Sequence, residues 1–162
     1  MITTYIGLGS NLSEPVKQIN QAIEHIARIE HSELITVSSL YLSKPMGPQD
    51  QDNYINAVFA LKTSLSALTL LDALQTIENN AGRVRKENRW GARILDLDIL
   101  LYGNQVIDNQ RLTIPHYGMK TREFVLLPLA EISPELVLPD KSKVFDLADN
   151  INTNDIKVYN NP

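Results

Sequence analysis

Two segments with helical spacing of apolar residues alternate with four strand-like segments, and this order constrains the fold more than any other feature. The helical segments are 14–30 and 67–81, where apolar residues recur every third or fourth position. The segments rich in strand-forming residues are 2–8, 33–42, 54–62 and 93–102. The order β-α-β-β-α-β is typical of the ferredoxin-like split β-α-β fold. We therefore expect an α+β fold with a mostly antiparallel sheet, both helices on one face, and C-terminal additions.

Length, charge and cysteine content narrow the class of protein. The 162 residues predict a single domain over 1–162 that ends in a polar tail at about 150–162. A net charge of −4 argues against general affinity for nucleic acid or anionic membranes. No stretch approaches the roughly 20 apolar residues of a membrane span, and the N-terminus lacks a signal-peptide pattern. The chain has no cysteine, which excludes disulfides and thiolate chemistry. We expect a cytoplasmic protein.

A cationic segment, residues 83–93, contrasts with the acidic remainder of the chain. It holds five of the 15 Lys and Arg residues and one acid, so its formal charge is +4 and the rest of the chain sums to −8. Arginine presents paired, planar donors that suit phosphate. Trp90, inside the segment, is suited to covering an aromatic ligand or to stacking on an arginine. The alternative interpretation is an exposed loop that only keeps the protein soluble.

Asp96 and Asp98 follow the cationic segment within a predicted strand. Alternate strand residues share a face, so their Cα atoms lie roughly 7 Å apart on the same side. The residues predicted to point the other way, towards the helices, are Leu95, Leu97, Ile99 and Leu101. Two carboxylates on one face repel unless a cation bridges them, and Mg²⁺ favours such oxygens with phosphate and water. The spacing suits two metals roughly 3.5–4 Å apart; the alternative is that both residues only cover a solvated sheet face.

Three weaker signals each have an ordinary alternative. His116 is the histidine best placed for chemistry, although a lone histidine is more often structural. Asn56 alternates away from Ile55 beside Tyr54 and suits recognition of a heterocycle edge, but a capping or bulge asparagine fits equally well. Residues 7–11 lack the Lys-Ser/Thr pair of a P-loop, so we interpret them as a tight strand-to-helix turn.

Taken together, these segments resemble the 6-hydroxymethyl-7,8-dihydropterin pyrophosphokinases of folate biosynthesis, over about residues 5–139. The most specific motif spans residues 82–103, Gly-Arg-Val-Arg-Lys-Glu-Asn-Arg-Trp-Gly-Ala-Arg-Ile-Leu-Asp-Leu-Asp-Ile-Leu-Leu-Tyr-Gly. The supporting motifs are Gly9-Ser-Asn11, Gly47-Pro-Gln-Asp50, Tyr54-Ile-Asn56 and Leu112-Thr-Ile-Pro-His-Tyr117. Chance agreement of several independent motifs in the same order is implausible.

The resemblance implies a Mg-dependent diphosphokinase. Such an enzyme transfers the pyrophosphoryl group of ATP to the pterin hydroxymethyl group and yields AMP and the pterin diphosphate, a step of tetrahydrofolate biosynthesis. It also implies that Asp96 and Asp98 bind two Mg²⁺ ions along the triphosphate. The cationic segment is then the loop that closes on ATP, with Arg83 and Arg93 near the transferred group. We expect a monomer and leave contact with neighbouring folate-pathway enzymes open.

The resemblance also assigns residues to three sets. The catalytic set is Arg83, Arg93, Asp96 and Asp98. The nucleotide set is Gln75, Glu78, Arg85, Trp90, Ile99, Arg111, Thr113, His116, Tyr117 and Arg122. The pterin set is Ser43, Lys44, Met46, Tyr54, Asn56, Trp90 and Phe124. Residues 43–46 differ from the Thr-Pro-containing stretch of many relatives, but they keep a hydroxyl and an apolar side chain.

Two other classes of protein remain possible from the sequence. A single-stranded RNA-binding module can have the same element order, and it predicts aromatic residues on the central strands and a basic sheet face. The paired aspartates argue against that interpretation. A metal-dependent regulatory domain that binds nucleotide without turnover is the second alternative.

Overall fold

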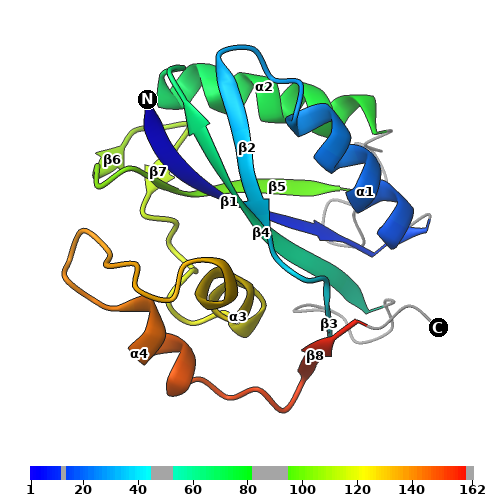
Figure 1. The fold of residues 1–162 in the computed structure, drawn as a ribbon, viewed down its shortest axis with the longest axis vertical. Helices are drawn as coiled ribbons and strands as arrows, with labels where there is room; N and C mark the ends of the chain where they lie inside the picture. The colour runs from blue at the N-terminus through cyan, green and yellow to red at the C-terminus, as the bar shows by residue number, and fades with distance from the viewer. Residues whose placement is uncertain (12–13, 45–52, 82–94, 160–162) are drawn as a thin grey trace.

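The computed structural model describes residues 1–11, 14–44, 53–81 and 95–159. Its elements follow the predicted order and add several short ones at the C-terminal end (Figure 1). In chain order they are β1 (Ile2–Ser10), α1 (Pro15–Ile26), β2 (Ser32–Val37), β3 (Tyr41–Ser43), β4 (Tyr54–Thr63), α2 (Ala67–Asn80), β5 (Asp96–Tyr102), β6 (Ile107–Asp108), β7 (Thr113–Ile114), α3 (Glu123–Ile132), α4 (Val144–Asp149) and β8 (Ile156–Val158).

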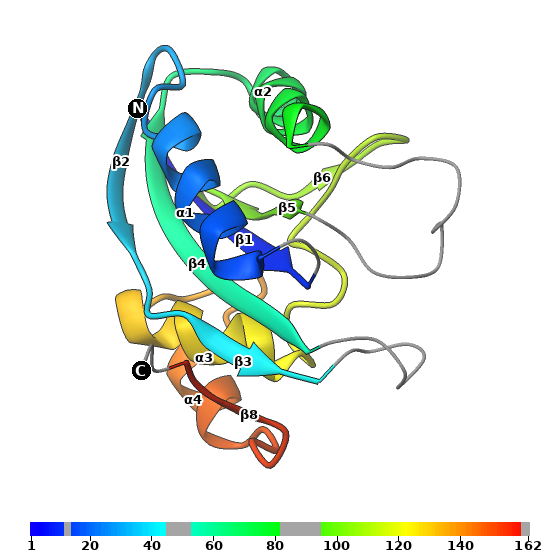
Figure 2. The ribbon, with the colours of Figure 1, turned by 90° about the vertical axis from the view of Figure 1, so that its right-hand side faces the viewer.

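The main sheet is antiparallel in every strand pair that the structure describes. Its order is β5-β1-β4-β3-β8, and β2 also pairs with β4. The α1 and α2 helices lie on the same side of this sheet (Figure 2). A separate hairpin is formed by β6 and β7. The predicted α+β fold, with an antiparallel sheet and both core helices on one face, is confirmed.

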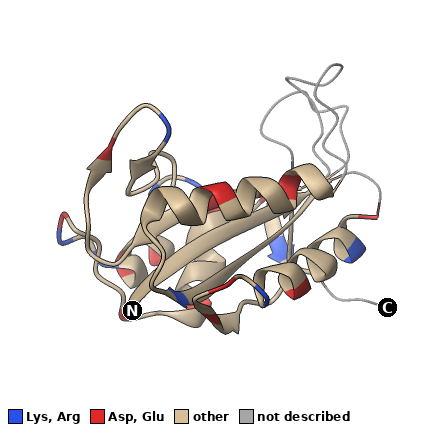
Figure 3. Cartoon of the chain, turned by 90° about the horizontal axis from the view of Figure 1, so that it is seen from above, with Lys and Arg blue, Asp and Glu red and all other residues tan. Residues whose placement is uncertain are grey.

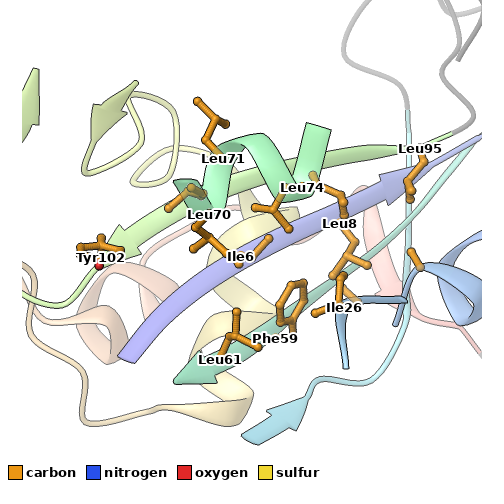
Figure 4. Close-up of a cluster of buried hydrophobic side chains, with 14 of the residues drawn as sticks. Ile6, Leu8, Ile26, Phe59, Leu61, Leu70, Leu71, Leu74, Leu95 and Tyr102 are labelled. Atoms are coloured by element: carbon orange, nitrogen blue, oxygen red, sulfur yellow. The ribbon is translucent and has the colours of Figure 1, made fainter. Parts of the chain in front are cut away.

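The larger hydrophobic core lies between the sheet and the α1 and α2 helices. Figure 4 shows Phe59 and Ile6 from the sheet directed towards Leu70 and Leu74 of α2, and all four are fully buried. The predicted apolar stripe of α1 is confirmed, since its members pack in this core. Burial of such side chains contributes roughly 1.5–3 kcal/mol each, so this core fixes the helices on the sheet.

The opposite sheet face is covered by α3, on which α4 packs. Leu101 belongs to this second cluster, together with Val58, Leu100, Val125 and Leu129. The predicted direction of Leu101 is therefore wrong, whereas Leu95, Leu97 and Ile99 face the helices as expected. The reason is a register shift in the β1–β5 pair, where consecutive β1 residues face Leu101 and Ile99. The extra residue reverses the alternation that follows it.

The predicted strand over 33–42 is two strands, β2 and β3, separated by residues 38–40. Ser38 marks the break, because its hydroxyl accepts the Val58 N–H at 3.0 Å and its own N–H bonds the Val58 carbonyl at 2.8 Å. The Ser38 hydroxyl thus replaces a backbone carbonyl as the acceptor of the Val58 N–H, which interrupts the regular strand pairing. The predicted turn at 7–11 is also corrected, since β1 continues to Ser10.

The predicted C-terminal additions include α3, α4 and β8. Pro128 does not interrupt α3, where it is buried with Val125, Leu126 and Leu129. Packing against the second cluster offsets the one backbone hydrogen bond that proline cannot donate. The predicted polar tail contains β8, which pairs with β3 (Figure 1).

The described surface carries acidic and basic residues interspersed over its elements (Figure 3). None of the helices in the described ranges combines the length and the hydropathy needed to cross a bilayer.

Candidate functional site

Asp96, Gly9 and Asn56 form a row across three neighbouring strands, with Asp96 opposite Gly9 and Gly9 opposite Asn56. Paired residues of antiparallel strands share a face, so the carboxylate and the amide flank Gly9 with Cα atoms about 10 Å apart. A Cβ on Gly9 would lie 3.2 Å from Asn56 Oδ1 and 3.7 Å from Tyr54 Cδ1. The lack of a side chain at Gly9 therefore lets Asn56 and Tyr54 lie close to the backbone of β1 between two predicted site residues.

Asp98 lies in the next row, opposite Gly7 of β1. Its side chain is 55% exposed, and Asp96 is half-buried, so both carboxylates border solvent. Among the described residues, no group of three or more His, Cys, Asp or Glu side chains could hold a metal ion. The pair fits Mg²⁺ only as part of its coordination shell, which would need water and ligand oxygens in addition.

Glu78 approaches the same strand from α2. Its side chain is buried, and Oε2 accepts the backbone N–H of Leu97 at 2.8 Å. Leu97 separates the two aspartates. Because α2 is packed on the core, this hydrogen bond fixes the position of β5 relative to α2 at the two carboxylates. A buried, charge-assisted bond of this kind is among the stronger ones in proteins.

A pocket of about 440 Å³ opens beside β5 between the end of α2 and the β6–β7 hairpin. It contains most of the predicted nucleotide set together with the two aspartates. The predicted residues that line it are Gln75, Glu78, Asp96, Asp98, Ile99, Arg111, Thr113, His116 and Tyr117. Residues from three separate parts of the chain thus meet in one concave site, as a small-molecule site requires.

His116 lies next to Asp98, with 4.0 Å between Nε2 and Oδ2. The bulge of β5 positions it, because the Leu100 carbonyl accepts the His116 N–H at 3.0 Å. Nδ1 accepts the Gly118 N–H at 3.1 Å, so a neutral ring carries its proton on Nε2. Burial lowers the pKa of His116, the nearby Asp98 carboxylate opposes that shift, and Arg122 adds to it. A neutral Nε2–H donor towards the pocket is the result.

Arg111 is held at the outer wall of the pocket. Its Nη2 lies 2.6 Å from Asp72 Oδ1 and 3.2 Å from Gln75 Oε1, both on α2. The Asn109 side chain accepts the Arg111 N–H at 2.9 Å and shapes the turn before it. A guanidinium oriented in this way presents its remaining donors to an anion in the pocket.

Arg122 connects the pocket with the predicted pterin side. Its guanidinium lies 5.2 Å from the ring centre of Tyr117 and 5.8 Å from that of Phe124. Tyr117 in turn stacks on His116, with ring centres 4.6 Å apart. Tyr117, at one end of this stack, lines the pocket, and Phe124, at the other, lies in the first turn of α3 on the sheet face of the aspartates.

On the pterin side, Ser43, Tyr54 and Asn56 come together on β3 and β4. Ser43 pairs with Tyr54, and the Asn56 amide donates to Ser43 Oγ at 2.6 Å. Lys44 does not join them, since its Nζ lies 3.1 Å from Asp155 Oδ1. The remaining predicted residues, Met46, Arg83, Arg85, Trp90 and Arg93, lie outside the described residues.

Several residues of the pocket and of the adjoining row were not predicted as site residues from the sequence. Leu71 precedes Gln75 and Glu78 at helical spacing on α2, a signal that would have identified it. Gly9 was interpreted as a turn residue, and only the strand register shows it beneath Asn56. Asn109 and Gln110 have no distinctive sequence signal.

Residues 5–134 match the family described as 7,8-dihydro-6-hydroxymethylpterin-pyrophosphokinase (HPPK). The chain is 58% identical over 147 residues to a 2-amino-4-hydroxy-6-hydroxymethyldihydropteridine pyrophosphokinase of Haemophilus influenzae, covering 91% of each chain. It is 54% identical over 136 residues to the Pseudomonas aeruginosa protein of the same name, covering 84% of this chain and 83% of that one.

Solved structures share the fold at low sequence identity. A Plasmodium falciparum HPPK-DHPS variant with pterin and p-hydroxybenzoate aligns with a TM-score of 0.75 at 15% identity, over 97% of this chain and 46% of that one. The wild-type HPPK-DHPS of the same organism aligns with a TM-score of 0.70 at 16% identity, over 98% of this chain and 47% of that one. The chain thus spans about half the length of these solved proteins. Because the family match covers most of the chain and the two bacterial relatives are similar over nearly their whole length, this protein belongs to the HPPK family.

Proposed function

We propose that this protein transfers the pyrophosphoryl group of ATP to the hydroxymethyl group of 6-hydroxymethyl-7,8-dihydropterin. The pterin oxygen forms a bond to the β-phosphorus, the bond from that phosphorus to the α,β-bridging oxygen breaks, and AMP leaves. The hydroxyl proton passes to solvent. The observation that carries this proposal is the row Asp96–Gly9–Asn56, because it joins the pocket beside β5 to the predicted pterin residues.

The pocket supports binding of the nucleotide. The neutral His116 ring offers its Nε2–H, and Arg111 offers guanidinium donors from a fixed position. Phosphoryl transfer needs little covalent help from the protein and much positioning and charge neutralisation. Arg83 and Arg93, which the family resemblance assigns to the transferred group, would add positive charge opposite the aspartates.

Asp96 and Asp98 would hold Mg²⁺, with two ions expected along the triphosphate. Their shared face and exposure fit hard-cation binding that phosphate oxygens and water complete. When bound, the metal neutralises phosphate charge in the transition state. The aspartates' own contribution is to present two carboxylates from a strand that Glu78 holds in place.

Pterin would lie beside the row Asp96–Gly9–Asn56. Asn56 and Ser43 offer polar atoms at one edge, and Phe124 offers an aromatic face near the Arg122 guanidinium. Trp90, from the cationic segment, would cover the opposite face of the ring. Covering the flat heterocycle in this way would exclude water from the site. Without water as a competing acceptor, ATP would be protected from hydrolysis. We also propose that the protein acts as a monomer.

The sheet face gives no support to the RNA-binding alternative. The central row carries a carboxylate, a glycine and an amide, whereas RNA-binding sheets carry stacked aromatics. In the view of Figure 3, acidic and basic residues of the described chain alternate over its elements.

One assay tests the proposed reaction. The protein is incubated with Mg²⁺, ATP and 6-hydroxymethyl-7,8-dihydropterin, and the nucleotide product is identified by chromatography. AMP that forms only when pterin is present supports the proposal. ADP would show ordinary γ-phosphoryl transfer instead, and nucleotide binding without turnover would support the regulatory alternative.

A further inference from the structure

We propose that the C-terminal strand β8, through Ile156, positions the pterin side of the site. This inference rests on the proposed function, because it concerns the pocket in which the pterin would bind. It extends that function to a part of the chain beyond residues 5–134, the segment that matches the family.

Strand β3 has only three residues, and it lies between β4 and β8 (Figure 1). Ser43, its last residue, pairs with Tyr54 on one side and with Ile156 on the other. Directly paired residues share a face, with Cβ atoms about 4.5–5.5 Å apart. Ile156, Ser43 and Tyr54 therefore form a second row, next to the row Asp96–Gly9–Asn56, which continues through Tyr41 to Val158.

The exposure of the two β8 residues on this face separates their roles. Ile156 is 9% exposed, whereas Val158 is 45% exposed. Ile156 is thus packed against its neighbours, and Val158 borders solvent. Only Ile156 lies in the row of Ser43, because Val158 pairs with Tyr41.

Ser43 connects β8 to the site, because it pairs with Ile156 and also bonds Asn56. Its hydroxyl accepts the Asn56 amide at 2.6 Å, which determines the orientation of the buried Asn56 side chain. The amide oxygen then lies over Gly9, where an added Cβ would be 3.2 Å away. A shift of the end of β3 would therefore change where Asn56 presents its oxygen.

The two ends of β3 are anchored differently. Glu131 of α3 holds the first end, because its carboxylate accepts the Tyr41 hydroxyl at 2.7 Å and the Ser39 N–H at 2.9 Å. At the other end the C-terminal segment supplies the ion pair Asp155–Lys44 and the packing of Ile156. That pair is more than half exposed, so its contribution is small. The positioning role falls to Ile156.

The test compares Ile156→Ala, which removes three carbons from a buried side chain, with Val158→Ala, which removes two from an exposed one on the same strand and face. Steady-state kinetics give KM for the dihydropterin and for ATP. Calorimetry gives the Kd of oxidised 6-hydroxymethylpterin in the presence of a non-hydrolysable ATP analogue, and the Kd of the analogue alone. We expect Ile156→Ala to raise the pterin KM and Kd about 5- to 20-fold, since small displacements of a binding group weaken it strongly. The analogue Kd should stay within about twofold, Val158→Ala should match wild type, and Ile156→Val should restore most pterin affinity.

Equal behaviour of the two alanine variants would overturn the inference. A parallel loss of analogue and pterin binding in Ile156→Ala would also overturn it, because it would show general destabilisation. If wild type binds pterin but forms no AMP, the proposed function fails, and the pterin Kd of the two variants still decides the inference. If wild type binds no pterin, both fail.

Discussion

The Glu78 carboxylate accepts the backbone N–H of Leu97 at 2.8 Å, and Leu97 lies between Asp96 and Asp98. This bond connects the helix packed on the core to the strand that presents both candidate metal ligands. The family resemblance assigns Glu78 to the nucleotide, and the structure adds a second task for the same side chain. Glu78 therefore connects the stability of the fold to the geometry of the site.

Replacing Glu78 should show how much its hydrogen bond to Leu97 stabilises the fold. Glu78→Ala removes the acceptor of a buried N–H, which should cost about 1.5–3 kcal/mol of unfolding free energy in urea titrations. Glu78→Gln keeps an oxygen acceptor and should lose less. Glu24→Ala, on the exposed part of α1, is the control and should be close to wild type. Wild-type stability of Glu78→Ala would contradict a structural role for this bond.

Asp96→Asn and Asp98→Asn should each lower kcat by about a hundredfold or more, because a weakened metal site leaves the phosphate charge of the transition state without its neutralising cation. Asparagine keeps the size of the side chain, so the fold should be retained. Rates are measured over a range of Mg²⁺ concentrations, with Asp108→Asn on the β6 strand as the control. Near-normal rates of the site variants at every Mg²⁺ concentration, low ones included, would rule out the proposed metal role.

Gly9→Ala should weaken pterin binding selectively. Its Cβ would lie 3.2 Å from Asn56 Oδ1, so the amide must move, and we expect a pterin KM about three- to tenfold higher. Gly7→Ala is the matched control, because its Cβ would make an ordinary 3.7 Å contact with Leu100. An unchanged pterin KM in Gly9→Ala would show that the site tolerates a methyl group.

The low pKa of His116 predicts a pH-dependent stability. Burial lowers this pKa from its ordinary value of 6.5, so the unfolded chain binds the proton more readily. The stabilising contribution is therefore complete above pH 6.5 and is lost as the pH falls through the folded-state pKa. Urea unfolding between about pH 5 and 7.5, without nucleotide or metal, should show a shallower slope for His116→Gln than for wild type. His25, which is exposed on α1, provides the control variant His25→Gln. Identical slopes for wild type and His116→Gln would contradict the shift.

The fold was largely predictable because its signals are local. The apolar stripe of α1 and the alternation around Asp96 and Asp98 follow from helix and strand periodicity alone. The side chains of both patterns pack on the predicted side, except Leu101, where the bulge in β5 reverses the face. A bulge depends on pairing with another strand, which no local pattern records. The same holds for the break at Ser38, whose hydroxyl bonds the backbone of Val58.

The sequence by itself determined the order of elements, the pairing of two carboxylates on one strand face, and the motifs that place the chain in its family. Only the tertiary structure decided that Gly9 lies between Asp96 and Asn56, that Glu78 holds the strand of the aspartates, and that Ile156 lies beside Ser43. Periodicity follows from backbone geometry within a few residues, so it can be read along the chain. Contacts between distant segments depend on strand register and on core packing, which only the folded chain establishes.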